Sequence, residues 1–116
     1  MRTYFNGEHE MATIRINYSK PGATFANAYA ARADKNQFFP PELQQQVNDS
    51  DAQLLLDGII TQEVEYFWDQ TTFQYTRQLK VNSLQTYWDN MNYDKHETKT
   101  LAEQAGWTFD GVIVVP

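Results

Sequence analysis

The chain lacks cysteine altogether and has little histidine. Its 116 residues include no cysteine and two histidines, His9 and His96. Without cysteine neither a disulfide framework nor a thiolate zinc site can form, so composition leaves the redox compartment open. A centre built on both histidines would have to join the extreme N-terminus to a segment far along the chain. We therefore expect no metal and no other cofactor.

Positive charge and long apolar runs are also scarce. The net charge is -6, and the 9 Lys and Arg are scattered singly along the chain. Nucleic-acid binding needs a basic patch, so no direct nucleic-acid partner is expected. No apolar run approaches the roughly 20 residues that cross a bilayer, which predicts no membrane partner. We expect a cytoplasmic protein or a virion component whose partner is protein, either a second copy or a member of an assembly.

The first ten residues differ from the rest because they show no periodicity. Met11 opens a cleaner segment, and the codons of Gly7 and Glu8 are expected to be purine-rich, as a bacterial or phage ribosome-binding sequence would be. Two interpretations stay open for residues 1–10, an N-terminal arm or a mis-annotated start. Residues 11–116 are expected to form one domain.

Aromatic residues are abundant, with 3 Trp, 7 Tyr and 7 Phe making up 15% of the chain. The most regular pattern among them is a period of two over residues 60–68 and again over 73–81, which is typical of β-strands. The segment 69–72 between them is short and polar, and Asp69 can accept hydrogen bonds from backbone amides two residues on. The sequence therefore predicts an antiparallel hairpin with a four-residue turn at 69–72.

The other elements follow from periodicity and capping residues. Ser50 and Gln53 have capping-box spacing, Gly58 and Gly106 suit helix C-termini, and Ser83 or Asn82 can cap a helix. Residues 23–33 fit either a helix or a strand, and their alanines favour a helix. The other predicted elements are a strand ending near Tyr18, a loop at 34–39, helices at 41–47 and 50–57, two helices or one bent helix after Ser83, and a last strand at 107–116, buried on both faces or split by a turn at Asp110-Gly111.

This order of elements predicts an α+β fold, the ferredoxin-like split βαβ sandwich, with an antiparallel sheet, a central hairpin at about 60–81 and helices on one face. At the level of architecture it is similar to the dimeric α+β barrel proteins, in which two such sheets pack face to face. No family motif is matched residue by residue, and the fold alone implies no function.

One group of side chains stands out as a candidate ligand or interface site. The hairpin pattern places four aromatic residues and one cation on the same sheet face: Tyr66, Trp68, Phe73, Tyr75 and Arg77. An aromatic pocket with a single cation suits an anionic aromatic ligand. The same face can instead be covered by helices or by a second subunit, which the sequence favours, with Arg77 in a buried ion pair or at the rim.

Other polar groups are better explained as solvated surface. The group Asp89, Asp94, His96 and Glu97 has neither HExxH nor calcium-loop spacing. Glu63 and Glu65 are expected to lie on the water-facing side of the hairpin. No catalytic residues and no metal ligands are predicted, and an enzyme is the less favoured reading.

Three functional hypotheses remain. The first is a small non-enzymatic interaction or structural protein, of phage or bacterial origin, acting as a homo-oligomer or assembly component. The second is a small-molecule binding protein or cofactor-free enzyme with an aromatic pocket between sheet and helices, which requires a cavity there. The third is an acidic protein inhibitor, which requires clustered surface acids.

Overall fold

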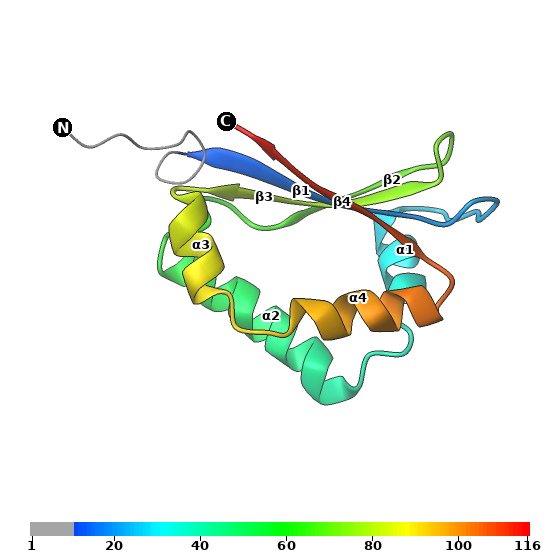
Figure 1. Ribbon diagram of the computed structural model, residues 1–116, viewed down its shortest axis with the longest axis horizontal. Helices are drawn as coiled ribbons and strands as arrows, with labels where there is room; N and C mark the ends of the chain where they lie inside the picture. Colours follow the sequence, from blue (N-terminus) through cyan, green and yellow to red (C-terminus); the bar gives the residue numbers. More distant parts are fainter. Residues whose placement is uncertain (1–10) are drawn as a thin grey trace.

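The computed structural model describes residues 11–116, which form four strands and four helices (Figure 1). In chain order these elements are β1 (Ala12–Ser19), α1 (Ala28–Lys35), α2 (Pro41–Leu56), β2 (Glu65–Asp69), β3 (Gln74–Val81), α3 (Leu84–Asn90), α4 (Lys95–Gln104) and β4 (Thr108–Val115). The interpretation of residues 1–10, together with His9, lies outside the described residues. Within 11–116 no helix combines the length and the apolar composition needed to cross a bilayer.

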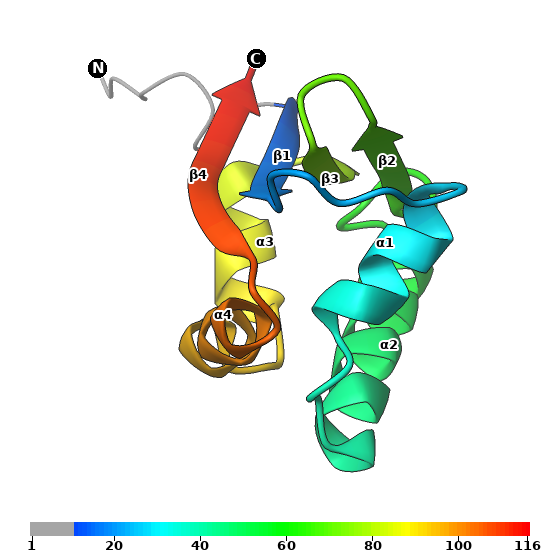
Figure 2. The same cartoon turned by 90° about the vertical axis from the view of Figure 1, so that its right-hand side faces the viewer.

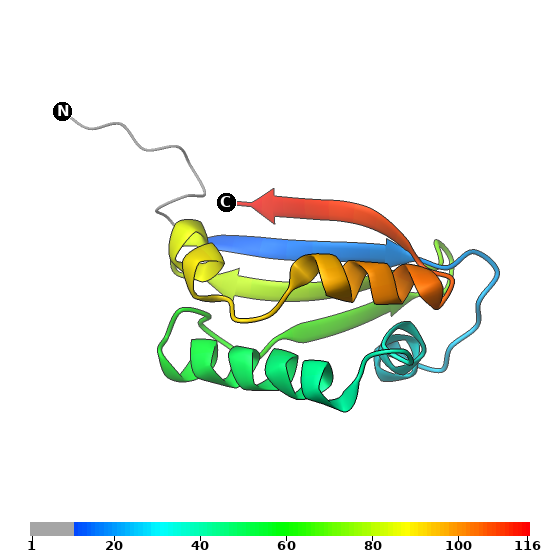
Figure 3. The ribbon, with the colours of Figure 1, turned by 60° about the horizontal axis from the view of Figure 1, so that its bottom comes forward.

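The strands form one open sheet in the order β2-β3-β1-β4, and each neighbouring pair is antiparallel (Figure 3). The four helices all lie on the same side of this sheet (Figure 1). The α+β class predicted from the sequence is therefore confirmed, as a four-stranded antiparallel sheet with helices packed on one face.

Period-two alternation in the strands separates a helix-facing side from an open side. In β3 the buried residues are Tyr75, Arg77, Leu79 and Val81, and the residues between them face the other way. The open side is mainly polar, and there the Thr76 hydroxyl donates to Asn17 Oδ1 at 2.7 Å. Polar side chains of this kind need no covering layer.

The covered side of the sheet holds two separate apolar clusters. The first joins β1, β3, α2 and α3 through Ala12, Ile14, Leu54, Ile60, Leu79, Val81 and Tyr87. The second joins β1, β3, α1 and α4 through Tyr18, Ala31, Tyr75, Ala102, Ala105 and Trp107. Ile16 is half-buried and packs against both clusters. The core thus has two ends, and β3 places Arg77 between them.

The expected break between helices at 41–47 and 50–57 is wrong, because α2 runs without interruption from Pro41 to Leu56. Ser50 does not cap a helix. Its buried hydroxyl accepts a hydrogen bond from the backbone N–H of Asn92, 3.0 Å away, and so joins α2 to the α3–α4 loop. The expected helix end is correct, since Asp57 is the C-cap and Gly58 follows with φ +71°, a conformation that suits glycine.

The hairpin is confirmed, but its first arm is shorter than expected. β2 begins at Glu65, and Ile60 forms only an isolated bridge to Val81. Between these two pairings four residues, 61–64, lie opposite two residues of β3, so the ladder cannot continue through them. Asp69 pairs with Gln74, which moves the four-residue loop by one position to 70–73.

Phe73 is therefore a turn residue, with φ +57°, and not part of the sheet face on which it was predicted. The backbone amides of Thr71 and Thr72 donate to Asp69 Oδ1, as the sequence suggested, and they hold the pKa of this carboxyl below its usual value.

Helix α1 begins later than predicted and extends through Lys35, so the loop expected at 34–39 starts only after it. Two helices follow the hairpin, which resolves the alternative left open by the sequence. Ser83 caps α3 and Asp94 caps α4.

The last strand is present, but the expected burial on both faces is wrong. β4 is an edge strand that pairs only with β1 within the described residues, and the side chains of Val112 and Ile113 are 42% and 53% exposed. No hairpin turn forms at Asp110-Gly111. Asp110 is an extra residue in the ladder, and Gly111, at φ +103°, completes the bulge.

Candidate functional site: a basic cavity under the sheet

A cavity of about 260 Å³ lies between the sheet and the helices. Figure 2 shows α1 and α2 on one side beneath the sheet and α3 and α4 on the other, and residues from both sides line this cavity. β1, β3 and β4 form its roof through Ile16, Tyr18, Tyr75, Arg77, Phe109 and Val112. The cavity occupies the place where the two apolar clusters do not meet.

The charged side chains that line the cavity are basic. Five of the 9 Lys and Arg residues of the chain line the cavity, and within residues 11–116 no Asp or Glu does so: the five are Arg32, Lys35, Arg77, Lys95 and Lys99. The other lining groups are mostly aromatic or aliphatic. A protein with net charge -6 has thus placed more than half of its cations around one apolar space.

Lys35 lies deepest among the lysines, with 7% of its surface exposed. It ends α1 and follows Ala31 by four residues, so the buried face of this short helix carries it inward. Its Nζ lies 5.0, 5.3 and 5.5 Å from the ring centroids of Tyr18, Phe39 and Tyr75, and it donates a hydrogen bond to Asn36 Oδ1 at 2.5 Å. Within residues 11–116 no carboxylate forms an ion pair with it.

Burial, followed by the charges of Arg77 and Arg32, lowers the pKa of Lys35 from 10.5 to about 7. Ring faces attract a cation but do not neutralise it, so they cannot replace a carboxylate partner. Burial also raises the pKa of Tyr18 to about 12 and that of Tyr75 further, which keeps both phenols protonated beside the amine.

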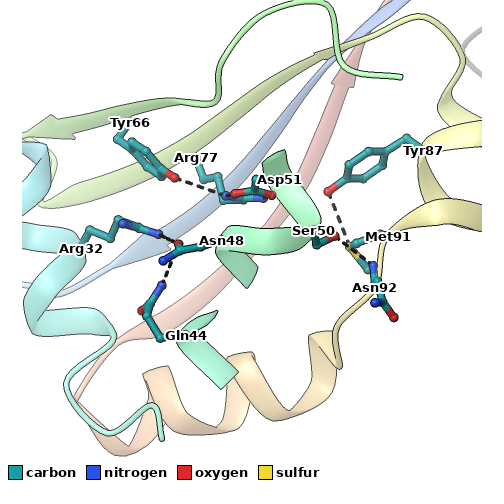
Figure 4. Close-up of polar contacts among 10 residues, drawn as sticks. All are labelled: Arg32, Gln44, Asn48, Ser50, Asp51, Tyr66, Arg77, Tyr87, Met91 and Asn92. Atoms are coloured by element: carbon teal, nitrogen blue, oxygen red, sulfur yellow. Dashed lines mark hydrogen bonds and ion pairs between the residues drawn. The ribbon is translucent and has the colours of Figure 1, made fainter. Parts of the chain in front are cut away.

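Arg77 is the buried cation of the sheet, and Asp51 of α2 is its partner (Figure 4). The two make a bidentate pair, with Nη1 2.7 Å from Oδ2 and Nη2 2.6 Å from Oδ1. Both side chains are largely buried. The parallel two-bond geometry is the strong form of a guanidinium–carboxylate contact, and it attaches α2 to the middle of β3.

The Arg77 guanidinium still has one donor without a partner. Its Nε–H is buried and makes no hydrogen bond, although Nη1 also lies 3.5 Å from the Tyr66 hydroxyl. A buried donor without an acceptor costs about 1–3 kcal/mol. Other atoms of Arg77 line the cavity.

The residues predicted as a site are brought together only in part. Tyr75 and Arg77 line the cavity, and across the hairpin Tyr66 is paired with Arg77 and Trp68 with Tyr75. Trp68 belongs to the second apolar cluster, where its ring centroid is 5.8 Å from that of Trp107. Tyr66 borders a separate hollow of about 320 Å³ that also includes Asp51 and Glu63.

Sequence reasoning missed Lys35, Asp51 and the α4 lysines. Lys35 was assigned to a loop, and only its spacing from Ala31 on a longer helix would have revealed its inward position. Asp51 follows Val47 by four residues and precedes the buried Leu54 by three, but the expected helix break hid this continuity. Lys95 and Lys99 are one helical turn apart and extend over the Trp88 and Phe109 rings, at 4.4 and 5.3 Å from the ring centroids.

Of the group Asp89, Asp94, His96 and Glu97, Asp94 caps α4, whereas Asp89 lies within α3 and accepts a hydrogen bond from Gln85 Nε2. Asp94 Oδ1 accepts hydrogen bonds from the backbone amides of His96 and Glu97, at 2.9 and 3.1 Å. Within residues 11–116 no three His, Cys, Asp or Glu side chains are grouped as a metal site would require.

Comparison of the chain with protein-family models, with curated proteins and with solved structures finds no match. The cavity and its charges are therefore the basis for any functional conclusion.

Loss of the Asp51 carboxylate should destabilise the protein strongly. Asp51→Ala leaves a buried guanidinium without its partner, and we expect the free energy of unfolding in urea to fall by about 3–5 kcal/mol. The control Asp49→Ala removes an exposed acid two residues away on α2 and should change it by less than about 0.5 kcal/mol. Equal effects of the two variants would contradict a buried, stabilising pair.

The buried amine predicts an unusual dependence of stability on pH. In the folded protein the pKa of Lys35 is lowered to about 7, whereas in the unfolded chain this side chain stays protonated up to about pH 10.4. Between these values the unfolded state binds more protons, so stability rises with pH by at most about 1.4 kcal/mol per pH unit. Relative to Lys35→Met, the wild type should therefore gain unfolding free energy from pH 7 to 9.5, below the range in which unfolded tyrosines ionise. Parallel curves for the two proteins would show that the lysine is not held as an amine.

Proposed function

We propose that this protein binds a small organic anion with an aromatic or similarly compact apolar body in the cavity under the sheet. The observation that carries the proposal is the segregation of charge: five cations line the cavity of a net acidic protein, and no carboxylate from the described part of the chain does. An apolar pocket with a few convergent polar groups is the usual form of a ligand site.

The size of the cavity supports a ligand with about one ring. Its 260 Å³ is near the lower end of the roughly 300–1,000 Å³ typical of ligand pockets. Tyr18, Phe39, Trp88 and Phe109 offer ring faces and edges to an apolar body. The anionic group would lie near the cations that line the cavity, among them the half-buried Lys99 of α4.

We also infer that the fold is of the ferredoxin-like split βαβ kind. The support is the strand order β2-β3-β1-β4, the central β2–β3 hairpin and the helices on a single face. Each crossover carries two helices in place of one, α1 with α2 and α3 with α4. The two helix pairs lie apart on either side of the sheet centre, and the cavity lies in the space between them.

A second candidate function is assembly as a homo-oligomer through β4. The hairpin aromatics Tyr66, Trp68 and Tyr75 are covered by this chain's own elements, which leaves β4 as the exposed apolar strand. Residues 112–115 carry no charge, so two copies of an acidic protein can bring them together without repulsion. Long uncharged edge strands are the usual sites of strand pairing between chains.

Binding should follow the charge of the cavity. We expect phenyllactate to change the fluorescence of Trp88, with the change lost in Trp88→Phe. The double variant Lys95→Glu/Lys99→Glu should weaken binding by about tenfold or more, because each nearby charge contributes at least about 1 kcal/mol.

The control for that variant is Arg15→Glu/Lys80→Glu, which makes the same change in net charge on the open side of the sheet and should leave affinity nearly unchanged. Equal weakening by both double variants, or equal binding of the neutral analogue 2-phenylethanol, would refute a charge-selective cavity.

Assembly through β4 can be tested by light scattering. If β4 pairs with its copy, Ile113→Lys should shift the solution mass toward the monomer. Phe67→Lys places the same charge on β2, at the opposite edge of the sheet, and should leave the mass unchanged. A monomeric wild type would rule this candidate out.

A further inference from the structure

We propose that Lys35 forms an imine with the carbonyl carbon of a 2-oxo acid bound in the cavity. This inference rests on the proposed function, because it assigns the anion a chemical class and gives the buried amine a role. It makes the cavity a site of covalent chemistry in addition to a site of recognition.

The geometry around the amine supports this role. Lys35 is largely buried and lines the cavity, so a molecule held there can lie next to it. No described carboxylate pairs with it, and its hydrogen bond goes to the amide oxygen of Asn36, which can orient a neutral amine. The rings of Tyr18, Phe39 and Tyr75 lie around the nitrogen, with centroids 5.0, 5.3 and 5.5 Å from Nζ.

The chemistry requires a neutral amine, and the surroundings supply one. The charged groups facing Lys35 are Arg32 on its own helix, Arg77 on β3 and the lysines of α4, and the phenols of Tyr18 and Tyr75 remain uncharged. An exposed lysine with a pKa of about 10.4 is neutral in about one molecule in a thousand at pH 7.4. Burial and the nearby arginines lower the pKa of Lys35 to about 7, so its neutral fraction at that pH is far larger. Desolvated lysines beside other cations are the ones that form Schiff bases.

The step balances without any oxidant or reductant. The lone pair of Nζ adds to the carbonyl carbon as the carbon–oxygen π bond breaks, and a proton passes from nitrogen to oxygen. The hydroxyl then takes up the second proton of the nitrogen and leaves as water, while the nitrogen electron pair forms the carbon–nitrogen double bond. The carboxylate of the same molecule lies next to the reacting carbon, where the cations of the cavity can hold it.

The test uses phenylpyruvate as the 2-oxo acid and sodium cyanoborohydride to reduce the imine to a stable secondary amine. Intact mass should show a single adduct on the full chain, and peptide mapping should place it on Lys35. Lys35→Arg and Lys35→Met should both lose the adduct, with folding verified by circular dichroism. Lys80→Arg, a matched change at an exposed lysine on the open side of the sheet, should retain it.

Phenyllactate separates this inference from the proposed function because it has the carboxylate but no carbonyl. It should bind, change Trp88 fluorescence and protect Lys35 from phenylpyruvate. If phenyllactate binds but phenylpyruvate leaves no adduct on Lys35, the imine is refuted and anion binding stands. Adducts spread over Lys80, Lys95 and Lys99 according to exposure also refute it. If neither acid changes Trp88 fluorescence and no adduct forms, both proposals fail.

Discussion

The buried pair between Arg77 and Asp51 is the interaction on which the rest of the structure depends. A guanidinium in the covered face of a sheet cannot pack as an aliphatic side chain does, so the apolar core divides into one cluster on each side of it. Asp51 of α2 offsets the cost of burying this guanidinium by accepting two short hydrogen bonds from it. The same bonds fix α2 against β3, while α4 packs near the other edge, and the cavity lies between them.

Charge follows a consistent pattern from surface to interior. The chain is acidic overall, but the interior space beneath the sheet is basic, and Lys35 and Arg77 face the same volume without a carboxylate between them. Burial and the repulsion of the nearby Arg77 and Arg32 make protonation of Lys35 costly, which is why its pKa is lowered. Functional sites are commonly places where such a cost is tolerated, because a ligand of opposite charge removes it.

The sequence predicted those parts of the fold that depend on local periodicity and capping. The α+β class, the hairpin with its Asp69 turn, and the caps at Ser83 and Gly58 were all predictable because each follows from neighbouring residues. The cavity was harder to predict from the sequence, because its charged residues come from separate elements. The inward position of Asp51 follows only from a continuous α2, and that of Lys35 only from an α1 that extends to residue 35. The edge position of β4 depends on sheet order, which an apolar run such as 112–115 does not encode.

A titration of backbone amide resonances with phenyllactate tests the central claim most directly. If the basic cavity is the binding site, the shifted amides will cluster at the end of α1 and the start of α4, at Lys35, Asn36 and residues 95–99, together with Tyr75 and Arg77 on β3. Shifts confined to the open side of the sheet or to β4, with α1 and α4 unaffected, would contradict it and place any ligand elsewhere.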